Sequence, residues 1–105
     1  MFKESITRAE NNTYETFSIS WSFNHGNCKY EGVVALTTIE DTAMASGIAK
    51  ADGDRITAYG NGRGRGYRYA AVGNMRHMFS AKGIDMNTII AEQACDRLLK
   101  LIDRN

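Results

Sequence analysis

The sequence predicts an α+β fold, in which a four-stranded antiparallel sheet made of two hairpins is followed by two C-terminal helices packed on one face. Two observations predict it. The first half of the chain alternates apolar and polar residues, and the second half repeats apolar residues at spacings of three and four. The 105 residues suffice for one domain with its own core. Within a single domain, residues 1–105, we expect the sheet at about 14–60, a Gly/Arg/Tyr loop at 60–68, and helices at about 69–82 and 87–103.

The clearest strand lies in YETFSISWSF, where serines separate large apolar residues, namely Phe17, Ile19, Trp21 and Phe23. This alternation gives the strand one buried and one solvent-facing side. The residues NHGN follow and tolerate the positive φ of a tight turn, and CKYEGVVALT then continues as a segment rich in β formers. The two segments predict a hairpin.

A second hairpin is predicted at 43–50 and 55–60, around the sequence ADGD. Asp-Gly between two β-forming segments is a strong turn signal. Alanine, serine and glycine pack poorly on a sheet, so residues 38–46 are also compatible with the start of a short helix. For residues 43–50 the choice between strand and helix stays open.

The second half predicts two helices. The first contains apolar residues at helical spacing, namely Val72, Met75, Met78 and Phe79. Asn87 is placed to cap the second helix. The second helix has a longer apolar stripe, formed by Ile90, Ala94, Leu98, Leu101 and Ile102. Both helices therefore have an apolar side that can cover the sheet.

Charge is unevenly distributed along the chain, although the net charge is only +1. Residues 1–54 hold four Lys or Arg against eight Asp or Glu, a net charge of −4. Residues 55–82 hold six Lys or Arg and no acid, and residues 83–105 hold three bases and four acids. A basic segment of this kind attracts an anionic partner without making the whole molecule basic, unless folding brings acids from elsewhere to neutralise it.

The tract GNGRGRGYRYAA, residues 60–71, lies between the last predicted strand and the first predicted helix. Glycines at a helix N-terminus let an anion approach backbone N–H groups, and arginines add charge-assisted hydrogen bonds. Interleaved Arg and Tyr are also typical of residues that follow a nucleic-acid backbone or anchor a protein interface. A simpler interpretation is that the tyrosines fix the loop to the core and the glycines make a turn. The candidate partner-binding residues are Arg63, Arg65, Tyr67, Arg68, Tyr69 and Arg76.

Part of this tract resembles a glycine-x-glycine-tyrosine segment found in small uncharacterised proteins of phages and mobile elements. The resemblance rests on Gly64, Gly66 and Tyr67 and covers about a quarter of the chain. Arg68 and Tyr69 depart from the pattern, because an acid or cysteine followed by Lys or Arg is more usual there. The resemblance implies a compact accessory protein that blocks a host defence or nucleic-acid-processing complex, as anti-CRISPR proteins do, and it implies no catalytic residue.

Metal and nucleophile chemistry has little support in the sequence. His25 and Cys28 have the spacing of half a zinc site, but no second pair accompanies them. His77 and Cys95 are single residues on predicted helices. We therefore expect no metal site and no catalytic residue.

Known phosphate-binding loops also fit poorly. The glycine spacing matches neither a dinucleotide fingerprint nor a Walker loop. Asn61, Gly64 and Gly66 echo the pyrophosphate loop of acyl-CoA N-acetyltransferases, in which Gln or Arg would replace the asparagine. No cofactor is therefore predicted.

We expect a non-catalytic binding protein whose leading partner is a host protein complex that it inhibits. The alternative is a nucleic-acid-binding protein that uses the Arg/Gly/Tyr loop, and the third hypothesis is a small acyl-CoA-dependent acetyltransferase.

The polar N-terminus and the lack of a long apolar run predict no membrane partner and a cytoplasmic location. Two cysteines are too few for a disulfide framework. The oligomeric state stays open, with a dimer among the possibilities.

Overall fold

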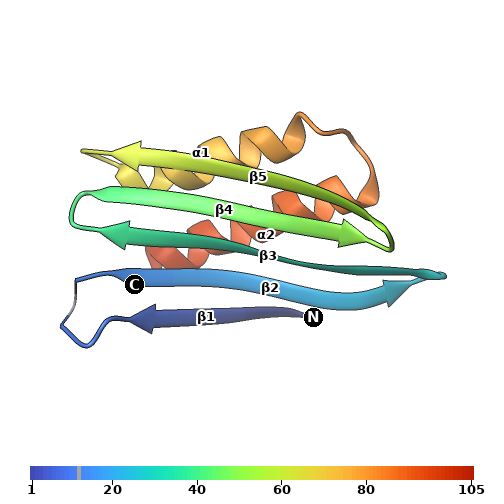
Figure 1. Ribbon diagram of the computed structural model, residues 1–105, viewed down its shortest axis with the longest axis horizontal. Helices are drawn as coiled ribbons and strands as arrows, with labels where there is room; N and C mark the ends of the chain where they lie inside the picture. The colour runs from blue at the N-terminus through green and yellow to red at the C-terminus, as the bar shows by residue number, and fades with distance from the viewer. Residues whose placement is uncertain (12) are drawn as a thin grey trace.

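The computed structural model describes residues 1–11 and 13–105. Within these residues, five antiparallel strands follow one another across one sheet, and two helices complete the chain (Figure 1). The strands are β1 (Phe2–Arg8), β2 (Glu15–His25), β3 (Cys28–Ile39), β4 (Thr42–Ala51) and β5 (Asp54–Arg63). The helices are α1 (Tyr67–Ser80) and α2 (Met86–Asp103). The α+β class, the antiparallel sheet and the two C-terminal helices are confirmed, whereas the prediction of four strands is wrong.

The strand missing from the prediction is β1, which pairs with β2 along its whole length. Its helix-facing positions are Phe2, Glu4, Ile6 and Arg8, so two charged residues interrupt the apolar alternation. Glu4 can occupy this position because Arg104, just after α2, pairs with it. The apolar pattern alone therefore does not reveal a strand here.

The second hairpin forms from β4 and β5, so residues 43–50 are strand and not helix. Strand β4 pairs with β3 on one side and with β5 on the other. Alanine and glycine are suitable here because this part of the sheet lies directly under a helix and has little room for side chains.

The helices begin close to the predicted positions, but the cap of α2 differs. Asp85, and not Asn87, caps α2, because its Oδ1 accepts a hydrogen bond from the Thr88 N–H at 2.9 Å. Asn87 is buried inside the first turn and donates from Nδ2 to the carbonyl oxygen of Ala49 at 3.1 Å. The start of α2 is thereby fixed to β4.

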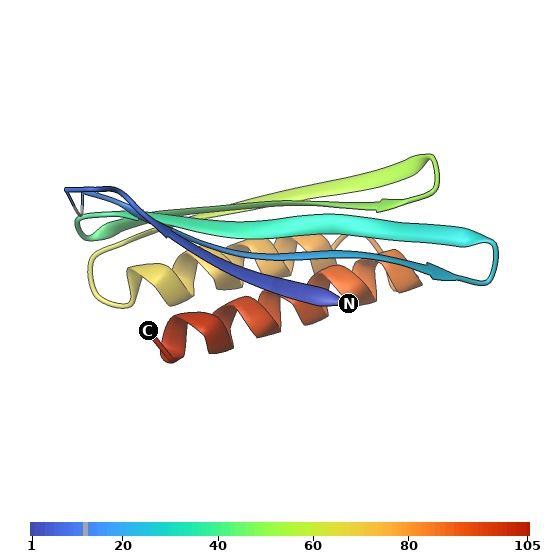
Figure 2. The same ribbon diagram turned by 90° about the horizontal axis from the view of Figure 1, so that it is seen from below.

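The molecule has two layers, and both helices lie on the same side of the sheet (Figure 2). Helix α1 packs mainly on β5 and β4, and α2 packs on β2, β3 and β4. The core contains large side chains on β2 and β3, such as Phe17, Ile19 and Leu36, and small ones on β4 and β5, such as Ala45 and Ala58. The opposite face of the sheet has no helix over it in the described part of the chain.

The first two glycines of the tract at residues 60–71 serve the packing of α1 on β5. A Cβ at Gly60 would lie 2.1 Å from the carbonyl oxygen of Ala71, and a Cβ at Gly62 would lie 1.9 Å from that of Tyr67. The prediction of a loop at 60–68 is therefore wrong in its bounds. Strand β5 continues to Arg63, α1 starts at Tyr67, and only residues 64–66 connect them. In that connection Gly64 and Gly66 have positive φ values of 74° and 72°, which favour glycine.

Candidate functional site

The six residues predicted to bind a partner do not form one surface. Arg63 ends β5 and lies on the side of the sheet away from the helices, and Arg65 is exposed in the connection. Tyr67 is half-buried against the core, and the guanidinium carbon of Arg68 lies 5.9 Å from the centre of its ring. The remaining two residues, Tyr69 and Arg76, contact α2 instead.

Arg76 and Tyr69 are engaged in contacts within the chain. The Arg76 guanidinium donates from Nε to Asp96 Oδ1 at 2.9 Å, and its Nη1 lies 3.4 Å from Glu92 Oε2. The hydrogen bond to Asp96 raises the pKa of Arg76. The hydroxyl of Tyr69 donates to Asp103, and this bond raises the pKa of the phenol. The basic segment is thus partly neutralised by acids of α2, as the alternative interpretation of its charge requires.

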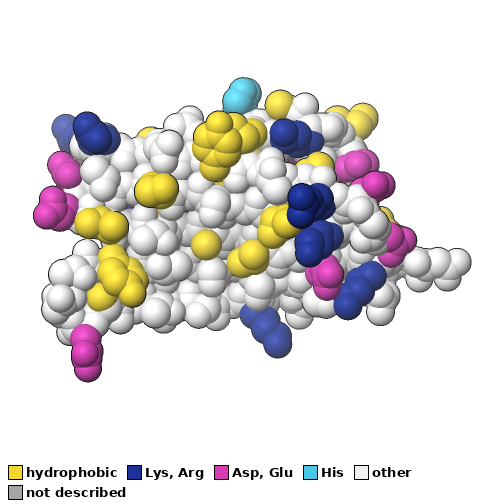
Figure 3. Space-filling view, in the orientation of Figure 1, with side chains coloured by type: hydrophobic (Ala, Val, Ile, Leu, Met, Phe, Trp, Pro, Cys, Tyr) yellow, Lys and Arg dark blue, Asp and Glu magenta, His cyan; other side chains and the backbone are white. Residues whose placement is uncertain are grey.

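The face of the sheet opposite the helices has no helix over it in the described residues, and we call it the open face (Figure 3). On β1 and β2 it carries serine and threonine, and Thr16 and Thr37 hydrogen-bond across β2 and β3 at 3.0 Å. On β3, β4 and β5 it carries exposed apolar side chains, namely Val33, Ile39, Met44 and Tyr59. A solvent-facing side of an antiparallel sheet is usually polar, so these side chains indicate an interaction surface.

The strand residues of the open face have a strong excess of positive charge. They include one acid, Glu31, and five bases, which are Lys3, Lys29, Lys50, Arg55 and Arg63. Lys29 pairs with Glu31 at 3.4 Å. Within residues 1–11 and 13–105, no carboxylate lies within ion-pair distance of the other four bases. The carboxylates of Glu40, Asp41 and Asp52 belong to the turns at the ends of the face.

Lys50 and Arg55 are directly opposite each other on β4 and β5. Like charges at directly opposed positions destabilise a sheet. On the other side of Lys50, Glu31 is its direct partner on β3, but the ion pair formed by Glu31 goes to Lys29. This end of the face therefore holds two adjacent cations, and no carboxylate of the described residues lies within ion-pair distance of either.

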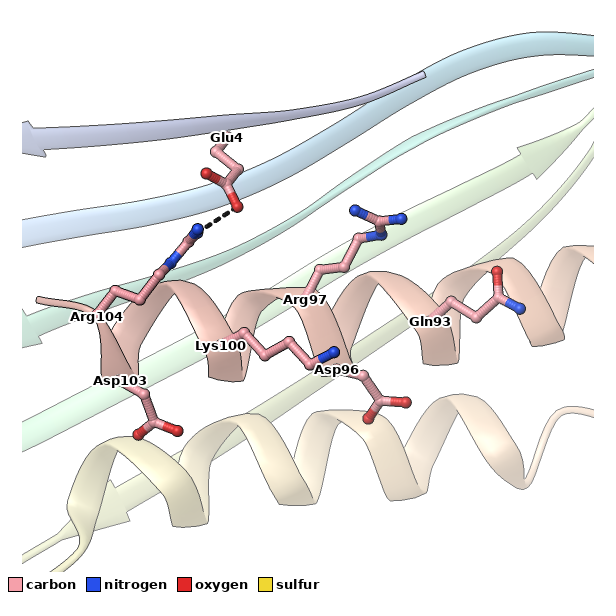
Figure 4. Close-up of a pocket in the computed structure, with 7 residues that line it drawn as sticks. All are labelled: Glu4, Gln93, Asp96, Arg97, Lys100, Asp103 and Arg104. Carbon is pink, nitrogen blue, oxygen red and sulfur yellow. Dashed lines mark hydrogen bonds and ion pairs between the residues drawn. The ribbon is translucent and has the colours of Figure 1, made fainter.

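A groove beside α2 has a volume of about 730 Å³. Figure 4 shows its charged side chains, which are largely engaged within the chain. Glu4 pairs with Arg104, and Asp96 and Asp103 point toward α1, where Arg76 and Tyr69 bind them. The guanidinium carbon of Arg97 lies 4.4 Å from the centre of the Phe2 ring. The groove thus consists mainly of contacts that hold α2 to its neighbours.

In the described part of the chain, His25, Cys28 and Cys95 do not come together as a reactive set. His25 and Cys28 are paired at the end of the β2–β3 hairpin, and no group of three or more His, Cys, Asp or Glu in the described ranges could hold a metal ion. Cys95 is buried, and this burial raises the pKa of its thiol to about 12. A thiol with so high a pKa is a poor nucleophile near neutral pH.

No helix in the described residues has both the length and the apolar character needed to cross a bilayer. Family models, curated proteins and solved structures were compared with the chain, and none of them matches it. The open face is therefore the candidate functional site on physical grounds alone.

Proposed function

We propose that the protein is a non-catalytic binding protein that holds a single strand of nucleic acid on its open face. The observation that carries the proposal is the composition of that face, where five Lys or Arg residues accompany one Glu and an exposed tyrosine. Lysine and arginine neutralise phosphates, and an exposed aromatic ring stacks on bases of any sequence. Serine, threonine and asparagine between them add hydrogen-bonding groups.

The shape of the face favours a single strand over a duplex. The major groove of DNA admits a helix or a two-stranded ribbon, and a five-stranded sheet is wider than either. A single strand has unstacked bases that can lie flat against a sheet, which is how sheet-based RNA-binding modules use their aromatic residues. We therefore expect weaker binding to duplex than to single strands.

The test is fluorescence anisotropy with labelled 20-nucleotide single-stranded DNA, single-stranded RNA and duplex DNA at 50 and 200 mM salt. For single strands the salt slope is about −0.7 per neutralised phosphate, so five contacts predict a loss of affinity of at most about 100-fold over this range. The variant Lys50→Glu/Arg55→Glu should lose binding. A matched variant on the helix side of the molecule, Lys82→Glu/Lys100→Glu, makes the same change in net charge and should keep most of it. No binding by the wild type at 50 mM salt refutes the proposal.

A second candidate is docking on a protein, and the apolar part of the open face favours it. Val33, Ile39 and Met44 are exposed on β3 and β4, and the cations lie toward the ends and edges of the face. An apolar centre with a charged rim is typical of protein interfaces. The partner surface would then be apolar with carboxylates at its rim, and the protein would act by covering it, as the resemblance to phage accessory proteins implies.

The two candidates respond differently to substitution of the apolar centre. Met44→Asp adds one negative charge and removes an anchor, so it should abolish docking on a protein and lower nucleic-acid affinity only modestly. The measurement is chemical cross-linking and mass spectrometry of proteins bound by the wild type and by the variant. Ile84→Asp, at an exposed site between α1 and α2, is the control. If the wild type shows no nucleic-acid binding and its bound protein is lost only with Met44→Asp, the second candidate replaces the first.

A further inference from the structure

The outer row of β5 has a symmetrical arrangement of side chains. Alternate residues of this strand face away from the helices, and all five are exposed, namely Arg55, Thr57, Tyr59, Asn61 and Arg63. A cation stands at each end, an aromatic ring stands in the middle, and one hydrogen-bonding side chain lies between the ring and each cation. We infer that this row is the track for the single strand, with Tyr59 stacking on a base and the two arginines holding phosphates on either side. The inference rests on the function proposed above.

The length of the row sets the length of strand that it can hold. With a rise of about 3.3 Å per residue, the Cα atoms of Arg55 and Arg63 are about 26 Å apart, and Tyr59 is about 13 Å from each. A stacked strand advances about 3.4 Å per nucleotide and an extended strand advances further, so the row spans about four to eight nucleotides. A strand too short to reach both arginines should therefore bind much more weakly.

Tyr59 is the aromatic residue that is free to stack at the middle of this face. Its side chain is 62% exposed, and its direct neighbour on β4 is Ser46, which is too small to cover the ring. The two tyrosines of the tract at residues 60–71 are engaged, because Tyr67 packs against the core and Tyr69 bonds to Asp103. Base stacking on an aromatic ring requires an open ring face, and Tyr59 provides one.

The row is held in place by the contacts of β5 on its other side. Strand β5 is an edge strand, but its inward positions include Gly60 and Gly62, which bring the backbone of α1 against it. In addition, Asn74 of α1 donates from Nδ2 to the carbonyl oxygen of Asn61 at 3.2 Å. The outward side chains therefore project from β5 while α1 supports that strand from the other side. Strand β5 is already ordered before any nucleic acid binds.

Lys50 strengthens one end of the track. It lies directly opposite Arg55, and neither residue has a carboxylate within ion-pair distance in the described residues. A phosphate between the two cations would relieve their repulsion and accept hydrogen bonds from both. Arg63 at the other end faces Thr42, so the two ends differ in positive charge. The difference gives the track a stronger and a weaker end.

The experiment measures anisotropy of labelled oligothymidines of 3, 6, 9 and 12 nucleotides with the wild type and with variants of the row. Tyr59→Ser should lower affinity for the 12-mer about 5- to 150-fold, the range for loss of one stacked base. Tyr59→Phe keeps the ring and should bind as the wild type does. Tyr14→Ser, which removes another exposed tyrosine from outside the row, is the matched control. Circular dichroism of each variant checks that the fold is kept.

A second measurement locates the strand on the molecule. In a titration followed by amide chemical shifts, the 12-mer should perturb residues 54–63 of β5 and Lys50 more than residues of β1 and β2. Suppose that Tyr59→Ser binds the 12-mer as tightly as the wild type does, while Lys50→Glu/Arg55→Glu does not bind it. The oligonucleotide then lies elsewhere on the open face, so the inference fails while the proposed function stands. If the wild type binds none of the strands, both fail.

Discussion

Replacement of Gly62 by alanine tests whether the glycines of the tract exist to admit α1. The added Cβ would lie 1.9 Å from the carbonyl oxygen of Tyr67, and contacts under 3.0 Å essentially never occur for real Cβ atoms. Because the obstacle is backbone, no side-chain rotation relieves it, and the start of α1 must move by at least about 1.1 Å. Overpacking of this kind costs about 1–3 kcal/mol or more. We expect the free energy of unfolding to fall by about 3 kcal/mol for Gly62→Ala.

The assay is urea unfolding followed by the fluorescence of Trp21, which is the chain's single tryptophan and is only 3% exposed. Gly73→Ala is the matched control, because this glycine lies on α1 with nothing within 4 Å of the added Cβ. That control should stabilise the protein by about 0.5–1 kcal/mol, the usual gain for alanine over glycine inside a helix. A change of less than about 0.5 kcal/mol for Gly62→Ala would refute the account of the tract, because it would show that α1 does not press on β5.

Three further predictions concern the cap, the thiols and the cations of the open face. Asp85→Ala should lower the free energy of unfolding by about 1 kcal/mol. The hydrogen bonds that Asp85 accepts from Thr88 lower its pKa, so this contribution is present above the unfolded pKa of about 4 and is lost as the pH falls through the lower folded pKa. Urea unfolding at pH 7 and pH 2 should show a smaller difference between Asp85→Ala and wild type at the lower pH. Cys95 is buried, so it should resist a thiol reagent at pH 8 in the folded protein and react only after unfolding. Cys28 is half-buried and should react without unfolding. Mass spectrometry of the labelled peptides shows which of the two cysteines has reacted. Arg55→Ser should raise the free energy of unfolding by up to about 1 kcal/mol, because it removes a like charge directly opposite Lys50, while lowering nucleic-acid affinity. Unchanged stability would indicate that the two cations do not repel measurably.

The sequence was sufficient for the elements that follow a regular period. The alternation from Phe17 to Phe23 and the stripe that begins at Ile90 mark β2 and α2, because both segments bury one side against the same core. Strand β1 was not predictable in this way. Its inward residues include Glu4, and the partner of this carboxylate, Arg104, is 100 residues away.

The candidate site was harder to predict because it depends on register between strands. Lys3, Lys50 and Arg55 are far apart or on different sides of a turn in the sequence, and only the pairing of five strands places them on one face. The tract itself contained one usable signal. Glycine recurs at every second position from Gly60 to Gly66, which is the period of a strand. This period is compatible with a flexible loop, but it also indicates a strand with one side packed closely against a neighbouring element, as is found at Gly60 and Gly62.

The close approach of α1 to β5 explains why glycine alternates with polar residues at the end of β5, at Gly60 and Gly62. The inward residues at the end of β5 must be small to admit the helix, so side chains that bind a partner can occupy only the outward positions of β5. Arg55, Tyr59 and Arg63 lie there.

The charges of the chain are also divided between the open face and the remaining residues. The strand residues of the open face carry five bases and one acid, a net +4, so the rest of a chain of net charge +1 carries −3. A polyanion would be attracted to the cations of these strands, so its binding should respond to salt according to the face and not to the net charge.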